Sequence, residues 1–269
     1  MMLKSTTEWH LKSHCVEDLK EELISRGFFA YAIEHKTDET RVILYTEDED
    51  FVRDLLKRTD SELVEKRSSR VDDWFRYMKL EPFEIADGIW VDPTDRLKLR
   101  NAVVVKMKPS AAFGTGDHPT TLLAARLLIQ YLKNTYSVLD VGCGTAILAI
   151  IAAKLGARKV TALDNDPVAV EVAKEFVKKN RVKVDVILSD LLSNITGRYD
   201  LVVANILTPV IIELIDQVDK VTNAGSTLIV SGIPAKDETV VKRHLRSRNF
   251  EIMSEGEMQN WKAFAVKIC

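Results

Sequence analysis

The chain is organised around one stretch, Val138-Leu-Asp-Val-Gly-Cys-Gly-Thr-Ala-Ile-Leu-Ala-Ile150. Its first four residues are typical of a short, fully buried strand. Gly142 and Gly144 then allow a sharp turn that brings the backbone close to a ligand. From Thr145 onward, the spacing of apolar residues predicts a helix. A strand, a glycine-rich turn and a helix N-terminus together form the ligand site of an open parallel α/β sheet.

The spacing of the glycines distinguishes between two kinds of ligand. Dinucleotide pyrophosphates are bound by G-x-G-x-x-G, and here the third glycine is replaced by Ile147. The pattern Asp140-x-Gly142-x-Gly144, followed by small residues, is instead typical of the first motif of class I methyltransferases. Their cofactor, S-adenosylmethionine, carries no phosphate. We therefore predict that Asp140, Gly142 and Gly144 bind this cofactor.

A second apolar segment, Lys159–Asp164, ends in a carboxylate 22 residues after Gly142. A carboxylate at about 20 residues from the first glycine lies at the end of the neighbouring strand, where it can accept hydrogen bonds from ribose hydroxyls. The alternative is a plain surface aspartate after a strand. Because strand, glycines, helix, strand and acid follow in the expected order, we predict that Asp164 binds the ribose.

The composition is that of an ordinary globular protein, with 46% hydrophobic and 29% charged residues. No apolar run reaches membrane-spanning length and the first residues lack a signal-peptide core, so we expect a cytoplasmic protein without a membrane partner. The three cysteines include no CxxC pair and the five histidines have no metal-ligand spacing. This predicts a reduced chain without a metal site.

Charge is distributed unevenly along the chain. Residues 1–69 hold 11 Lys and Arg against 16 Asp and Glu, a balance of −5, whereas the remainder holds 27 against 24, a balance of +3. Phosphate binding requires lysine and arginine, so we expect no direct nucleic-acid binding by the acidic N-terminal part. An acidic surface suits a basic partner.

Residues 1–69 have the pattern of a small ferredoxin-like α+β domain, with elements in the order strand, helix, strand, strand, helix, strand. The predicted elements are strands at about 5–12, 28–35, 41–46 and 61–66, and helices at 16–26 and 49–58. We find no catalytic cluster among them. Residues 70–82 are predicted to form a linker helix that ends before Pro82, and residues 83–269 the catalytic domain.

Strands and helices continue to alternate after the glycine motif, which predicts a Rossmann-like α/β domain with a seven-stranded, mostly parallel sheet. The predicted strands are 184–188, 199–207, 227–233, 250–258 and 261–268, and the helices are 168–180, 209–222 and 237–248. Asp190 follows the first of these strands, where its carboxylate can accept a hydrogen bond from the adenine amino group. An ordinary helix cap is the alternative.

The loop Ala111–Thr121 is rich in Gly, Pro and Thr and leads into a predicted helix that ends near Leu132. One interpretation is a turn with a helix cap, because Pro119 and the threonines after it suit a helix start. However, the loop also combines two glycines, a histidine and Phe113. That combination favours a wall over the cofactor.

Asn205 closes the apolar strand 199–207 at the edge of the sheet where ligands bind. Many amino-methylating enzymes carry Asn/Asp-Pro-Pro and an aromatic residue here, and this chain has Asn205-Ile-Leu-Thr-Pro209. The hydrogen-bond acceptor is kept and the stacking aromatic is missing, which favours a tetrahedral amine over a flat ring. We predict that Asn205 is catalytic. The alternative is that it caps the helix beginning near Pro209.

Three segments together resemble the PrmA family, whose members methylate the eleventh protein of the large ribosomal subunit. They are Phe113-Gly-Thr-Gly-Asp-His-Pro-Thr-Thr121, the glycine motif, and Asn205-Ile-Leu207. The resemblance covers residues 70–269 by motif and residues 1–69 by fold pattern only. The chain has Asp117 where the family usually has threonine, and Ala146 where it usually has glycine.

This resemblance implies that S-adenosylmethionine is contacted by Thr121, Gly142, Asp164 and Asn205, beneath a loop that carries Phe113 and Gly114. It also implies that residues 1–69 bind the substrate protein, and that lysine ε-amines and the N-terminal α-amine are trimethylated. We expect a monomer. Asp117 and His118 are better suited to structural roles than to chemistry. Two rival functions stay open: methylation of another protein or a small-molecule amine, and non-catalytic binding of S-adenosylmethionine.

Overall fold

The computed structural model describes residues 5–26, 28, 31–35, 40–70, 81–108 and 116–269. Contacts divide the chain into two compact units, Met1–Leu80 and Glu81–Cys269. Of the predicted linker helix 70–82, residues 71–80 lie outside the described residues, Arg70 ends a strand, and residues 81–82 are not helical. Among the helices that are described, none combines the length and the apolar character needed to cross a bilayer.

The first unit has the element order predicted from the sequence: β1 (Ser5–Ser13), α1 (Val16–Ser25), β2 (Tyr31–His35), β3 (Thr40–Tyr45), α2 (Glu49–Arg58) and β4 (Ser61–Arg70). Its antiparallel sheet has the strand order β2-β3-β1-β4. Strand β4 extends beyond the predicted segment 61–66, because it pairs with β1 as far as Arg70. The two helices and one face of the sheet enclose a core of Trp9, Leu11, Leu19, Leu23, Val42, Leu44, Val52 and Leu55.

The second unit begins with a small sheet of three strands, β5 (Phe83–Ala86), β6 (Ile89–Asp92) and β7 (Val103–Lys106). It continues with α3 (Pro119–Tyr131), β8 (Ser137–Val141), α4 (Ile147–Lys154), β9 (Lys159–Asp164), α5 (Pro167–Asn180), β10 (Asp185–Leu188), β11 (Tyr199–Asn205), α6 (Thr208–Gln217), β12 (Thr222–Pro234), α7 (Glu238–Ser247), β13 (Glu251–Met258) and β14 (Trp261–Lys267). A short 3₁₀ turn, Val218–Lys220, ends α6 earlier than predicted.

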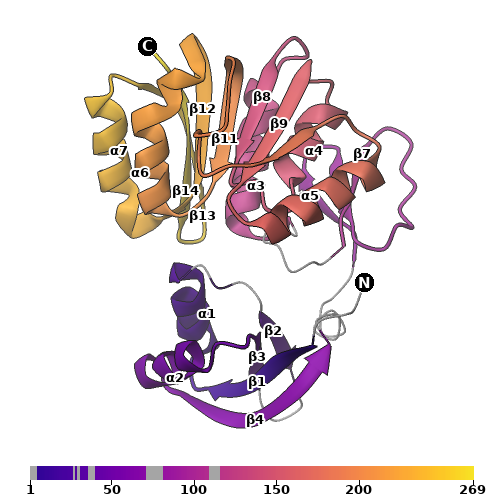
Figure 1. Cartoon of the computed structure of the whole chain (residues 1–269), viewed down its shortest axis with the longest axis vertical. Coiled ribbons are helices and arrows are strands. Elements are labelled where there is room, and N and C mark those ends of the chain that lie inside the picture. The colour runs from indigo at the N-terminus through magenta and orange to yellow at the C-terminus, as the bar shows by residue number, and fades with distance from the viewer. Residues whose placement is uncertain (1–4, 27, 29–30, 36–39, 71–80, 109–115) are drawn as a thin grey trace. The chain divides into compact units, whose positions relative to one another are not determined.

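The large sheet confirms the predicted seven-stranded, mostly parallel architecture. Its order is β10-β9-β8-β11-β12-β14-β13, and only β14 pairs antiparallel with its two neighbours. One apolar core joins the sheet to α3, α4 and α5, and a second joins the other face to α6 and α7 (Figure 1). The chain proceeds from β8 toward β10 on one side and from β11 toward β12 on the other. The switch point of the sheet therefore lies between β8 and β11.

The helix after the glycines starts later than predicted, at Ile147 instead of Thr145. Gly142 has φ +67°, Gly144 has φ +53° and Ala146 has φ +60°, so the backbone has positive φ at three residues before the helix begins. Alanine is disfavoured there by about 1–2 kcal/mol. Ala146 therefore departs from the family pattern at a position where the backbone favours glycine.

Candidate cofactor and methyl-transfer site

The predicted site residues meet where the parallel strands end. Strands β8 and β11 are neighbours, with Val141 opposite Ala204, so Gly142 and Asn205 follow at the same edge of the sheet. Asp164 ends the next strand, β9. This edge at the switch point is where open α/β sheets bind their ligands.

The glycine turn is held by main-chain geometry and by one carboxylate. Gly142 has φ +67°, and a Cβ atom there would collide with Cγ2 of Ile206 in the β11–α6 connection. The amide of Gly144 donates to Oδ2 of Asp164 at 2.8 Å. The turn after β8 is thereby joined to the end of β9, and any larger residue at Gly142 would have to displace Ile206 and adopt a strained positive φ.

Asp164 keeps the capacity to bind a ribose. Oδ2 accepts from Gly144 at 2.8 Å, and Oδ1 accepts from the Asp166 amide at 3.0 Å. Each carboxylate oxygen can accept about two hydrogen bonds. The remaining lone pairs fit two ribose hydroxyls, so the residues present are compatible with S-adenosylmethionine.

Asp140 has a different position from the one the sequence suggests. The sequence predicts a contact with the cofactor, but the structure leaves Asp140 only 1% exposed, with its carboxyl group accepting from the Ala149 amide of α4 at 3.0 Å. Burial raises the pKa of this carboxyl group to about 7, and the negative charge of Asp164 acts in the same direction. Asp140 therefore joins the end of β8 to the first turn of α4.

We expect Asp140→Asn to remove a pH dependence of stability. A carboxyl group whose folded pKa lies above its ordinary value of 3.8 retains a proton that the unfolded chain releases. The free energy of unfolding should therefore fall as the pH rises from about 4 to about 7, by a few kcal/mol, and then level off. Urea unfolding of both proteins across this range measures the difference. If the free energy of unfolding depends on pH in the same way for the wild type and for Asp140→Asn, Asp140 is ionised in the native state.

Asn205 is half-buried at the end of β11, and its Nδ2 donates to Oγ1 of Thr121 in α3 at 3.3 Å. This bond leaves Oδ1 as the open acceptor of the amide. Helix α6 has Leu207 as its N-cap and no side-chain cap hydrogen bond. The alternative that Asn205 caps this helix is therefore wrong.

The described part of the loop before α3 shows a helix cap. His118 is the N-cap of α3, its Nδ1 accepts from the Thr120 amide at 3.3 Å, and its ring packs against Trp261 with centroids 5.2 Å apart. These contacts give His118 a structural role. Asp117 is exposed. Phe113 and Gly114 lie outside the described residues.

Asp190 is exposed two residues beyond β10, at the ligand edge of the sheet. Its side-chain oxygens accept no hydrogen bond from a residue that the structure describes, so they are available to a ligand. Across the described ranges, no group of three or more His, Cys, Asp or Glu side chains is arranged to hold a metal ion.

Sequence reasoning missed Ser231 and Gly232, which lie beside Asn205. Ser231 is opposite Asn205 in the pairing of β11 with β12 and is fully buried. Gly232 has φ +86°, and a Cβ atom there would collide with the carbonyl oxygen of Ile206. The available signal was a serine and a glycine interrupting the apolar run 227–233.

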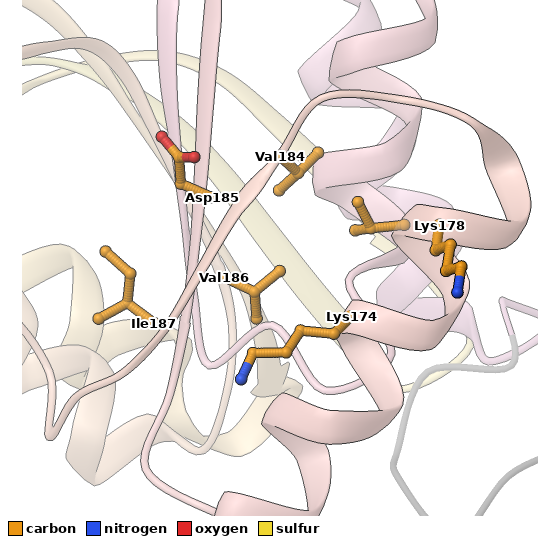
Figure 2. Close-up of a pocket in the computed structure, with 7 residues that line it drawn as sticks. Lys174, Lys178, Val184, Asp185, Val186 and Ile187 are labelled. Carbon is orange, nitrogen blue, oxygen red and sulfur yellow. The ribbon is translucent and has the colours of Figure 1, made fainter.

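A hollow of about 530 Å³ lies elsewhere, between α5 and the edge strand β10 (Figure 2). It is lined by Lys174, Val177, Lys178, Val184, Asp185, Val186 and Ile187. It contains none of the predicted site residues. A short edge strand flanked by charges is how proteins discourage pairing with other strands.

Comparison with known proteins identifies the family. The sequence matches the family described as Ribosomal protein L11 methyltransferase (PrmA) over residues 5–268. The ribosomal protein L11 methyltransferase of Thermotoga petrophila is 44% identical over 252 residues, covering 93% of this chain and 94% of that protein. That of Clostridium perfringens is 33% identical, with 88% and 82% covered.

A solved structure of a ribosomal protein L11 methylase from Lactobacillus delbrueckii subsp. bulgaricus is also similar. It matches with a TM-score of 0.65 and 29% identity, covering 69% of this chain and 97% of that one. The family match over nearly the whole chain confirms the resemblance found in the sequence motifs. The chain therefore belongs to the PrmA family of ribosomal protein L11 methyltransferases, class I enzymes whose methyl donor is S-adenosylmethionine.

Proposed function

We propose that this protein methylates ribosomal protein L11 on lysine ε-amines and on the N-terminal α-amine, up to the trimethylated state. The observation that carries the proposal is the orientation of Asn205. Its Nδ2 is bonded to Thr121, so its carbonyl oxygen is left to accept from an incoming amine. The names of the relatives and the family support L11 as the substrate.

S-adenosylmethionine supplies an electrophilic methyl group on a sulfonium. The amine nitrogen forms the new bond to this carbon while the carbon–sulfur bond breaks, and its electron pair remains on sulfur. The nucleophile must therefore be neutral. A lysine with an ordinary pKa of about 10.4 pays about 4–5 kcal/mol to be neutral near pH 7. A nearby positive charge and desolvation both lower that pKa.

In the first two transfers Asn205 aligns the neutral amine by accepting a hydrogen bond from its N–H group, and the methylated ammonium product then loses a proton to water. The neutral dimethylamine of the third transfer has no N–H, so it is aligned by the shape of the site alone, and its quaternary product loses no proton. A site without a general base contributes mainly by aligning the amine nitrogen with the methyl carbon within attack distance. The chain places no aromatic residue within Ile206–Pro209 to stack on a flat substrate. An amine on a flexible alkyl stem needs no such platform.

We assign the cofactor contacts as follows. Asp164 binds the ribose hydroxyls, Gly142 and Gly144 bring the backbone to the cofactor, and Asp190 accepts from the adenine amino group. Thr121 and Asn205 flank the reacting end, with Phe113 and Gly114 on the covering loop. Asp140 acts indirectly, by holding the first turn of α4, because its carboxyl group is buried and accepts from the Ala149 amide.

We expect Asp164→Ala to weaken S-adenosylmethionine binding by roughly ten- to a hundred-fold, because charge-assisted hydrogen bonds contribute about 1.5–3 kcal/mol. Asp166→Ala is the matched control. Its carboxylate caps α5 by accepting from Val168 at 2.8 Å, so its loss should cost about 1 kcal/mol of stability and leave affinity unchanged. Titration calorimetry measures both. Equal affinities for the wild type and Asp164→Ala would remove Asp164 from the site.

We assign residues 1–69 to a ferredoxin-like domain that binds L11, residues 70–82 to a linker and residues 83–269 to catalysis. The balance of −5 in residues 1–69 suits a basic partner. The enzyme would act as a monomer in the cytoplasm, where ribosomal proteins are made. No direct contact with nucleic acid is needed for this reaction.

The test is to incubate the full chain with labelled S-adenosylmethionine and purified L11, and to map the methylated nitrogens by mass spectrometry. Methyl groups on lysine ε-nitrogens and on the α-nitrogen support the proposal. Label on another ribosomal protein, but not on L11, would show a different substrate. Binding of S-adenosylmethionine without turnover on any ribosomal protein would indicate a non-catalytic binding module.

A further inference from the structure

The inference concerns Ser231, a buried serine on β12 that lies opposite Asn205 in the parallel pairing with β11. Its side chain is 0% exposed. Its hydroxyl group donates to the carbonyl oxygen of Thr120 at 2.8 Å. Thr120 lies in the first turn of α3, so this bond joins the end of a central strand to the start of a helix 111 residues earlier in the chain.

The next residue of that helix, Thr121, contacts the proposed catalytic amide. Its Oγ1 accepts from Nδ2 of Asn205 at 3.3 Å. This distance is near the long limit of a hydrogen bond, so a small outward movement of α3 would break it. Without that bond, the Asn205 amide could rotate and present its NH₂ group to the incoming amine, which would not align it.

The other side of Asn205 also restricts the amide. Oδ1 lies close to Gly232, where an added Cβ atom would come within 3.2 Å of it. Strand β12 therefore acts on Asn205 in two ways. Ser231 holds the helix that fixes Nδ2, and Gly232 leaves the space that Oδ1 occupies.

We propose that Ser231 is a positioning residue for methyl transfer: it sets the first turn of α3, so that Thr121 holds the Asn205 carbonyl oxygen toward the amine nitrogen. This role rests on the proposed function of Asn205. The structural alternative is a serine that merely satisfies a buried carbonyl. That alternative predicts an effect on stability and none on the chemical step.

The chain provides a matched control for this alternative in Ser226, on the same strand. Ser226 is also buried, and its hydroxyl donates to the backbone carbonyl of Tyr199 at 3.0 Å. Tyr199 begins β11, whereas Asn205 ends it. Ser226→Ala therefore removes the same kind of bond at the far end of the same strand pair, together with the bond that its hydroxyl accepts from the Asn223 amide at 3.2 Å.

The experiment compares the single-turnover rate on L11, the affinity for S-adenosylmethionine and the melting temperature of wild type, Ser231→Ala and Ser226→Ala. We expect Ser231→Ala to react roughly ten-fold more slowly with similar affinity, because small misplacements of reacting groups cost rate. Both variants should lose a few degrees of melting temperature. Ser226→Ala should lose at least as much as Ser231→Ala, because its hydroxyl makes two hydrogen bonds, and it should react at the wild-type rate.

A double-mutant cycle then tests whether Ser231 acts through Asn205. In an Asn205→Ala background, Ser231→Ala should cause no further loss of rate, because the group it positions is gone. Equal rates for the two serine variants, or the same ten-fold loss in the Asn205→Ala background, would overturn the inference. A wild-type enzyme that is inactive on L11 would overturn the proposed function itself and this role with it.

Discussion

Replacing Asn205 with alanine should lower the rate of methyl transfer about 100-fold, as expected for the loss of one preorganised polar group from an active site. The side chain lies at the ligand edge, orients its amide on Thr121 and caps no helix. Its one hydrogen bond to a described residue is 3.3 Å long. Stability should therefore change little.

Asn180 is the matched control, because it is an asparagine with a purely structural environment. It is 6% exposed, its Oδ1 accepts from the Lys106 amide, and its Nδ2 donates to the carbonyl oxygens of Lys106 and Phe176. Asn180→Ala should cost about 1–3 kcal/mol of stability without slowing the chemical step. Single-turnover rates and melting temperatures separate the two variants. A lower melting temperature with a normal rate for Asn205→Ala would give Asn205 a structural role.

Removing the first unit should abolish most activity on intact L11 while preserving the cofactor site. Each unit has its own apolar core, and all the proposed site residues belong to the second unit, Glu81–Cys269. Tethering a substrate through a second binding domain commonly raises apparent affinity by about 10²–10⁴-fold. A chain of residues 81–269 should lose activity on L11 by a factor in that range.

Two measurements control this experiment. Calorimetry should give the same affinity for S-adenosylmethionine with and without residues 1–80, and a short lysine peptide should be methylated equally slowly by both chains. If the shortened enzyme methylates intact L11 at the full rate, substrate recognition lies in the second unit.

Local sequence patterns predicted most of the second unit, because strand and helix periodicities and glycine turns depend on neighbouring residues. Helix α5 was predicted over 168–180 and begins at Pro167, and the strand to Asp164 has the expected bounds. Boundaries were missed where longer-range pairing or backbone angles decided them. Strand β4 continues with β1 to Arg70, and positive φ at Ala146 delays α4.

The sequence by itself thus determined the order of the elements, the family, and which residues follow the carboxyl ends of the strands. Only the tertiary structure decided what these residues do there. Asn205 and Thr121 are 84 residues apart in the chain, and Ser231 and Thr120 are 111 apart. Burial gives Asp140 a supporting position and raises its pKa to about 7. Hydrogen bonds between distant segments and the loss of water around a carboxyl group depend on how helices pack on the sheet, which no local pattern encodes.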